Sequence, residues 1–244
     1  MTHRVIKRYL VSFYWYSVLF LRNRFIGKVS YFSKLGAIRC TEVHISCPGP
    51  SAKLIEAYKF PTDTPVIFVN HAVSLVESRS FSNTRNFFFS ADGVRVDSII
   101  NSKLASLNKC TSIFVPGHLF QVTSKIIKSI DYIPTPKCRL SMKYGLIIED
   151  FNIDEIQPLS DRTICYGFGS LLMAISFALI FKPKVIHLWG SDLKEVNGLT
   201  YFSKDIPKLD QLPFDLIKSS ILTATKVLEI KGVKVMMHTS NEND

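Results

Sequence analysis

Several motifs that define common enzyme classes are missing from this 244-residue chain. It has no Walker-type Gly-Lys-Ser/Thr loop, no Gly-x-Gly-x-x-Gly fingerprint and no Gly-x-Ser-x-Gly elbow. It also lacks an Asp-x-Asp pair of the kind that holds a divalent metal on a sugar nucleotide. These absences exclude the nucleotide-binding and hydrolase classes that those motifs define, and they predict no metal site.

Cysteine is scarce and is not arranged in pairs. The five cysteines are scattered, odd in number and without a Cys-x-x-Cys spacing; they are Cys40, Cys47, Cys110, Cys138 and Cys165. Several of them lie in apolar runs. We therefore expect buried, reduced thiols in a cytosolic protein, and we expect neither a disulfide framework nor a zinc site.

Acidic residues are fewer than basic ones: the chain has 20 Asp and Glu and 30 Lys and Arg, which gives a formal charge of +10. A basic chain of this kind predicts an anionic partner. The basic residues crowd the first 40 positions and are diluted afterwards, without an arginine-rich tract. That distribution favours an anionic membrane surface over nucleic acid.

A hydrophobic run long enough to cross a bilayer is also lacking, because a span needs about 20 apolar residues. Residues 9–21 are apolar and strongly aromatic, with cationic residues on both sides. Arg22-Asn23-Arg24 follows where a secretory signal would carry small residues, so export is not expected. The segment predicts peripheral attachment at the cytoplasmic face of a membrane. The alternative interpretation is a core helix with solvated ends.

From Val43 onward, short apolar runs alternate with helical stretches. The predicted strands are residues 43–47, 65–69, 86–90, 112–115, 184–189 and 233–237, with helices over about 168–181 and 213–230. This alternation predicts an α/β fold with a mostly parallel sheet flanked by helices. We expect an N-terminal segment over residues 1–40 and a single domain over 41–244.

The first strand runs directly into the turn Pro48-Gly49-Pro50-Ser51 and then into the start of a helix. In an open parallel sheet, backbone N–H groups at such a helix start often bind a nucleotide phosphate, and Ser51 is a candidate cap for the helix. The alternative is a purely structural turn, because many strand–turn–helix units bind nothing.

Polar residues follow the other predicted strands, where ligands of such sheets bind. The residues expected at this edge are Gly49, Pro50, Ser51, Asn70, His71, Ser90, Asp92, Gly117, His118, Gly190, Ser191 and Asp192. Gly169 and Ser170 open the long apolar helix and are a second place for backbone to approach an anion. His187 lies inside a strand and is interpreted as a core histidine.

Four blocks in this order resemble the bacterial sialyltransferases of glycosyltransferase family 42 and related lipopolysaccharide-core transferases that use CMP-Kdo. The blocks are residues 45–51, similar to the family's nucleotide loop, residues 68–70, Gly169-Ser170, and residues 186–192, similar to a strand that ends Gly-x-Asp. The similarity extends over about residues 43–241.

The resemblance implies a Rossmann-like fold and transfer of a CMP-activated acidic sugar, sialic acid or Kdo, with inversion and without an obligatory metal or other cofactor. It implies a nucleotide site of Gly49, Pro50, Ser51, Asn70, Asp92, Gly169, Ser170, Gly190 and Asp192, and it places Tyr201 near the departing phosphate. The implied acceptor is a lipopolysaccharide or similar surface glycolipid at the cytoplasmic face of the bacterial inner membrane, and the basic N-terminal segment would hold the protein beside it.

The general base is the main departure from the family. Where the family has a histidine before the C-terminal helix, this chain has Phe214-Asp215. Asp215 is one candidate base, and His71 and His118 are others. Because of this departure, a nucleotide-sugar-binding protein without activity stays an alternative, as does a pyrophosphokinase-like relative.

Overall fold

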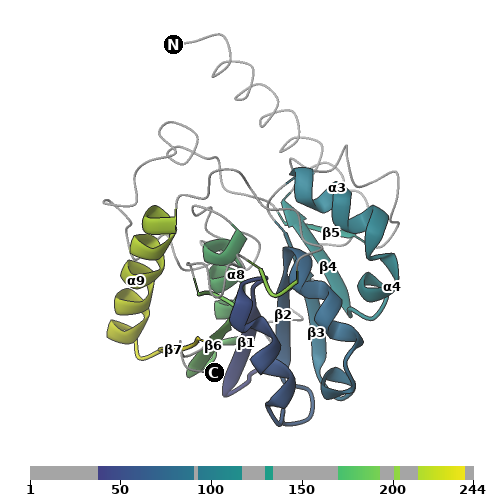
Figure 1. Ribbon diagram of the computed structural model, residues 1–244. Helices are drawn as coiled ribbons and strands as arrows, with labels where there is room; N and C mark the ends of the chain where they lie inside the picture. Colours follow the sequence, from purple (N-terminus) through teal and green to yellow (C-terminus); the bar gives the residue numbers. More distant parts are fainter. Residues whose placement is uncertain are drawn as a thin grey trace, which may run out of the picture.

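Seven strands form one sheet at the centre of the computed structural model, and every neighbouring pair in it is parallel (Figure 1). The structure describes residues 38–90, 93–116, 130–133, 170–192, 201–203 and 214–239. The strands are β1 (Glu42–Ser46), β2 (Pro65–Val69), β3 (Arg85–Phe89), β4 (Ser112–Pro116), β5 (Ile130–Ile133), β6 (Val185–Trp189) and β7 (Lys234–His238). The predicted α/β fold is confirmed, and the sequence analysis missed only β5 among these strands.

The strand order, β5-β4-β3-β2-β1-β6-β7, reverses direction at β1. The chain adds β2 to β5 on one side of β1 and then returns to add β6 and β7 on the other. Residues on β1 and β6 that are far apart in the chain, such as His44 and His187, are therefore neighbours in register. In open parallel sheets, ligands bind beyond the carboxyl ends of the strands at such a reversal.

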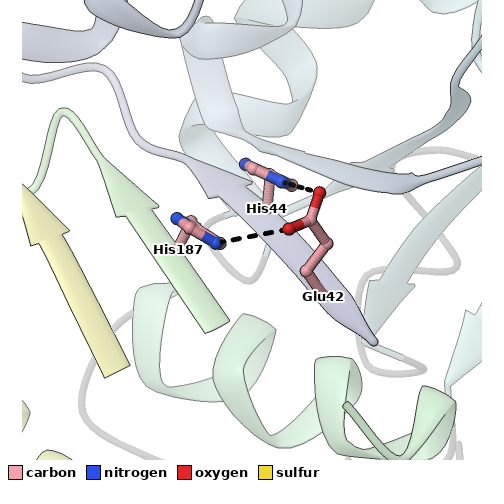
Figure 2. A group of neighbouring side chains, drawn as sticks. All are labelled: Glu42, His44 and His187. Carbon is pink, nitrogen blue, oxygen red and sulfur yellow. Dashed lines mark hydrogen bonds and ion pairs between the residues drawn. The ribbon is translucent and has the colours of Figure 1, made fainter. Parts of the chain in front are cut away.

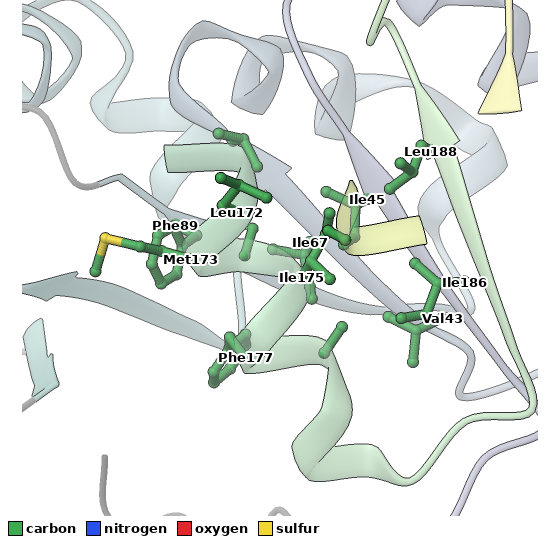
Figure 3. Packing of buried hydrophobic residues seen from close by; sticks show 14 of the residues in the cluster. Val43, Ile45, Ile67, Phe89, Leu172, Met173, Ile175, Phe177, Ile186 and Leu188 are labelled. Carbon is green, nitrogen blue, oxygen red and sulfur yellow. The ribbon is translucent and has the colours of Figure 1, made fainter. Parts of the chain in front are cut away.

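One face of the sheet is covered by α8 (Ser170–Ala178), η5 (Leu179–Phe181) and α9 (Phe214–Ile230). In Figure 3, side chains of α8 such as Ile175 point toward Ile45 of β1 and Ile67 of β2. Phe177 is fully buried there and contacts Phe87 and Phe89 of β3 edge-on and at a tilt. This apolar layer packs against the centre of the sheet and supports the strands whose carboxyl ends carry the loops.

The opposite face is covered by shorter elements. These are η1 (Pro50–Ala57), η2 (Asn70–Glu77), η3 (Arg79–Phe81), α3 (Gly93–Ser102) and α4 (Leu104–Leu107). They pack on Phe68, Phe88 and Trp189 of the sheet. The segment after β1 is thus a 3₁₀ helix. It begins at Pro50 with Gly49 as its N-cap residue and has no side-chain cap. The expectation that Ser51 caps this helix is wrong, because proline, with its preset φ, starts the helix one residue earlier.

Within the described residues, no helix has the length and apolar character needed to cross a bilayer. The predicted membrane-attaching segment, residues 1–40, lies outside the described residues except for its last three positions.

Candidate functional site

Two loops from opposite halves of the chain meet at the point where the strand order reverses. The N–H of Gly49 donates a hydrogen bond to the carbonyl of Gly190 at 2.9 Å, and Cys47 N–H donates to the carbonyl of Trp189 at 2.8 Å. A methyl group at Gly49 would overlap the Gly190 carbonyl, and one at Gly190 would overlap the Cys47 carbonyl. Gly190 also has φ of +64°, which L side chains rarely adopt. Both glycines are therefore needed for this close approach.

The Ser51 hydroxyl joins three segments at the same place. Its oxygen accepts a hydrogen bond from Gly190 N–H at 3.1 Å. The hydroxyl lies 2.9 Å from Asp192 Oδ2 and 2.9 Å from the carbonyl oxygen of His238. Since a hydroxyl has one hydrogen, it can donate to only one of these two acceptors at a time. Ser51 thereby ties the start of η1 to the ends of β6 and β7.

The backbone donors of this turn are already paired within the protein. Ser51 N–H donates to Asp192 Oδ2 at 2.9 Å, and Ala52 N–H donates to the Gly49 carbonyl at 3.0 Å. Pro48 and Pro50 have no N–H to offer. The Asp192 carboxylate thus accepts the hydrogen bond of the Ser51 N–H, and it occupies the position that was predicted for a phosphate.

Four further predicted residues lie near this edge. Asn70 follows β2 with φ of +54°, and its Oδ1 accepts a hydrogen bond of 2.6 Å from Ser90 at the end of β3. His71 is the second residue of η2 and is buried. Tyr201 is buried too, and the N–H of its neighbour Phe202 donates to the carbonyl of Pro48, which places this segment beside the turn after β1.

The remaining predicted residues are only partly covered by the structure. Ser170 is the first residue of α8 and is buried. Asp215 is the second residue of α9. Asp92, His118 and Gly169 lie outside the described residues.

A second group of polar side chains, which the sequence analysis did not anticipate, lies on the η1 side of the same strands. Glu42, His44 and Ser46 share one face of β1, and His187 and Trp189 extend that face onto β6. Figure 2 shows the Glu42 carboxylate beside both rings, with one oxygen facing a nitrogen of His44 and the other facing a nitrogen of His187. His238 of β7, in register with Trp189, completes the group.

Glu42 is the acceptor at the centre of this group. Its Oε1 lies 3.3 Å from His44 Nε2, and its Oε2 accepts a hydrogen bond of 3.2 Å from the Tyr58 hydroxyl. Oε2 also faces His187 Nε2 at 3.7 Å, which is an ion-pair distance rather than a hydrogen bond. These three contacts come from β1, from the residue after η1 and from β6.

A hydrogen bond from Trp189 determines the tautomer of His44. Trp189 Nε1–H donates to His44 Nδ1 at 3.1 Å, so a neutral His44 carries its hydrogen on Nε2, facing Glu42. On β7, His238 Nε2 lies 2.9 Å from His187 Nδ1. The His238 ring stacks on Trp189 with centroids 3.6 Å apart and planes 4° apart.

Burial favours the neutral form of all three histidines. It lowers the pKa of His44 to about 3, with His187 and His238 adding to the effect. Burial likewise lowers the pKa of His187, where nearby Glu42 acts in the opposite direction. The pKa of His238 is lowered by burial and then by His187. At pH 7 these side chains are therefore neutral imidazoles.

Glu42, His44 and His187 have ligand atoms within 4.8 Å of one another, so we asked whether they fit a metal ion. The Trp189 N–H occupies the only nitrogen of His44 that lacks a hydrogen, so Nε2 has no lone pair for a metal. The His44 and His187 rings are also stacked, 4.4 Å apart and 6° from parallel, so their in-plane lone pairs do not converge on one point. The trio fits a network of polar contacts and does not fit a metal site.

The sequence did contain a signal for this group. Polar or aromatic residues alternate with aliphatic ones along the strand Glu42–Ser46 and over residues 186–189 of β6, whereas a parallel strand buried on both faces is normally apolar throughout. His187 was interpreted alone as a core histidine. It is indeed buried, but its contacts to Glu42 and His238 show that it belongs to a network.

Two serine hydroxyls near this edge are buried without a hydrogen-bond partner within the described part of the chain. They are Ser46 Oγ, at the end of β1, and Ser191 Oγ, directly after Gly190. Buried hydroxyls normally have a partner, so each is a place for an ordered water or a ligand oxygen.

Comparisons with known proteins returned no family model, no curated protein and no solved structure that matches this chain.

Proposed function

We propose that this chain is a glycosyltransferase with a Rossmann-like fold that moves an acidic sugar, sialic acid or Kdo, from a CMP donor to a surface glycolipid. The observation that carries the proposal is the contact between residues 48–51 and residues 190–192, two of the four blocks on which the family resemblance rests. They lie 141 positions apart in the chain and meet where ligands of open parallel sheets bind.

The paired donors of the turn affect how a nucleotide would lie. A phosphate beside Ser51 N–H would be repelled by the Asp192 carboxylate, which already accepts that hydrogen bond. The same carboxylate attracts hydroxyl donors. We therefore orient the ribose of CMP toward Asp192 and the phosphate away from it, toward Tyr201 and the start of α8.

The chemistry of a CMP donor suits a site built from hydroxyl and amide donors. CMP leaves as a phosphate monoester, so there is no diphosphate that a metal must clamp. Hydroxyl groups, such as those of Tyr201 and Ser170, are the kind of donor that stabilises charge developing on the leaving phosphate. The basic, aromatic segment over residues 1–40 supports an acceptor at an anionic membrane surface.

Thermal unfolding in the presence of nucleotides tests the proposal directly. A ligand that binds only the native state raises Tm, so CMP should raise Tm whereas UMP, AMP and GMP should not. Incubation with CMP-sialic acid or CMP-Kdo and a lipopolysaccharide acceptor should then release CMP. Stabilisation by none of the four nucleotides, together with no release from either donor, would refute the assignment.

A matched pair of variants tests the orientation of the nucleotide. Asp192→Asn keeps an oxygen for Ser51 but removes the charge, and it should weaken CMP binding about tenfold or more, the loss typical of one hydrogen bond to a charged group. Asp63→Asn changes an exposed carboxylate at the opposite edge of the sheet, paired with Arg85, and should leave CMP binding unchanged. Tighter binding by Asp192→Asn would instead place the phosphate beside this residue.

One observation favours a second function, a nucleotide-sugar-binding protein without activity. The position where the family carries its basic histidine holds Phe214-Asp215. Tight CMP binding without turnover, unchanged in Asp215→Ala and His71→Ala, would favour this alternative. A requirement for ATP would instead favour the pyrophosphokinase-like relative.

A further inference from the structure

His238 occupies a position at the carboxyl edge that suits acid–base chemistry. It is the last residue of β7, it is half-buried, and its carbonyl shares the Ser51 hydroxyl with Asp192. Its ring lies flat against Trp189, and its Nε2 faces His187. The imidazole therefore belongs both to the histidine network and to the edge where the two loops meet.

The network determines which nitrogen of His238 carries a hydrogen. The Glu42 carboxylate faces His187 Nε2, so a lone pair on that nitrogen would be repelled and a hydrogen is favoured there. A neutral His187 then has its lone pair on Nδ1, which accepts the Nε2–H of His238 across 2.9 Å. A neutral His238 consequently carries its lone pair on Nδ1, the nitrogen that these contacts do not use.

We propose that His238 is the proton acceptor of this edge, presenting Nδ1 to a substrate hydroxyl, and that His187 and Glu42 are positioning residues that hold it in this tautomer. The identity of the hydroxyl rests on the proposed function, in which it belongs to the acceptor glycan. None of the residues weighed from the sequence as the base, Asp215, His71 or His118, is needed for this role.

The step balances without a further reactant. The acceptor O–H bond breaks and its proton goes to His238 Nδ1, while the oxygen lone pair forms a bond to the anomeric carbon of the sugar. The bond from that carbon to the phosphate oxygen breaks, and CMP leaves with the electron pair. The resulting imidazolium donates its Nε2–H to His187, whose own Nε2–H faces the carboxylate of Glu42.

The charges around His238 are consistent with a base that is neutral at pH 7. The pKa of His238 is lowered by burial and by His187. The titratable groups nearest to the pair are Glu42 and His44 on β1, Tyr58 after η1, Asp192 after β6 and Lys234 on β7 itself. Among these, Glu42 favours a proton on the pair, whereas Lys234 disfavours it.

NMR of the full chain labelled with ¹⁵N at its six histidines tests the tautomer without any substrate. His238 should be protonated at Nε2 and unprotonated at Nδ1 at pH 7.5, and it should titrate below the ordinary pKa of about 6.5. In Glu42→Gln the preference for this tautomer should weaken, because the charge that orients His187 is gone. A His238 that carries its hydrogen on Nδ1 in the unchanged chain would overturn the proposal.

Transfer kinetics test the role. His238→Gln places an amide near the former Nε2 position and keeps a donor for His187, but it has no base, so kcat should fall about 10²–10⁴-fold. Stabilisation by CMP should be unchanged. Met237→Gln introduces the same side chain on the opposite face of β7 and should retain full activity.

Glu42→Gln distinguishes positioning from a merely structural role. It should lower kcat and move the acid limb of the pH–rate profile to lower pH, because the imidazolium loses a stabilising charge.

Wild-type kcat in His238→Gln refutes the proposal. If the unchanged chain neither binds CMP nor transfers sugar, the proposed function is refuted instead, and the tautomer measurement decides whether His238 presents a base.

Discussion

At the scale of single residues, the most unusual side chain is His44, which is fully buried beside two other histidines. Its ring is neutral because burial disfavours the charged form; Trp189 donates to one nitrogen of this neutral ring, and Glu42 accepts from the other. Phe60 and Tyr58 cover it, with ring centroids 4.9 and 4.6 Å away. A proton added to this ring would have to break the bond from Trp189.

Stability should therefore depend on pH through His44. Its native pKa of about 3 is below the unfolded value near 6.5, so the unfolded state binds the extra proton first. The contribution of His44 is fully present above pH 6.5 and is lost as the pH falls toward 3, by up to about 1.4 kcal/mol per pH unit for one proton.

His44→Asn provides the measurement, because its Oδ1 can still accept from Trp189 while the side chain no longer titrates. Urea unfolding at pH 7, 6, 5 and 4 should give a flatter pH dependence for this variant than for the unchanged chain. Parallel curves would show that His44 titrates normally in the native state.

The described cysteines can be compared with the prediction made from their positions in the sequence. The expectation of buried, reduced thiols is consistent with the three described cysteines, which are free, with Cys47 buried and Cys40 and Cys110 partly buried. Burial raises the pKa of Cys47 and of Cys110 to about 12. Cys138 and Cys165 lie outside the described residues.

At the scale of elements, the sheet depends on two glycines that let the loops after β1 and β6 touch. Gly190→Ala should destabilise the fold by about 2–5 kcal/mol, since it adds a left-handed residue and an overlap with the Cys47 carbonyl. Gly232→Ala is the matched control. It also has positive φ, +79°, but a methyl group there meets nothing within 4 Å, so it should lose only about 1–2 kcal/mol.

Chemical denaturation of both variants measures the difference. Equal losses would mean that the contact between the two loops contributes little beyond the backbone conformation of Gly190.

The elements also show where prediction from sequence succeeded and where it did not. Short apolar runs, most of them next to proline or glycine, located six of the seven strands to within one residue, because the strands of a covered parallel sheet are largely apolar. The segment Ile130–Ile133 was missed because four residues containing a charged Asp131 give no such run.

The candidate site was only partly predictable for a physical reason. The turn residues Gly49, Ser51, Gly190 and Asp192 were predictable because each lies in a turn that follows a strand. The pairing of His187 with His238 depends on the lateral order of β1, β6 and β7, which local periodicity does not contain. Nor did the sequence indicate that Asp192 would pair with the Ser51 backbone N–H.

At the scale of the whole molecule, the strand order makes the two halves of the chain depend on each other. The strand β1 has β2 on one side and β6 on the other. Helix α8 packs on the face of the sheet that carries Ile45 and Ile67. A chain ending at residue 169 would lack α8, β6, α9 and β7, so it would expose this apolar face and a long unpaired edge of β1.

We therefore expect residues 1–169 to show no cooperative unfolding transition in urea. Adding a separate 170–244 fragment should restore near-UV circular dichroism, since it supplies the missing layer. A cooperative transition in the 1–169 chain alone would contradict this view of the fold.

The Ser51 hydroxyl, with one hydrogen and two acceptors at equal distance, has a consequence for how the turn after β6 influences the edge strand β7. A bound group that donates to Asp192 competes with Ser51 for that oxygen and releases the Ser51 hydrogen toward the His238 carbonyl. Rotation of a single O–H bond, without displacement of any heavier atom, then strengthens the attachment of β7 to η1. A ligand bound at Asp192 would in this way hold the edge strand β7 more firmly to η1.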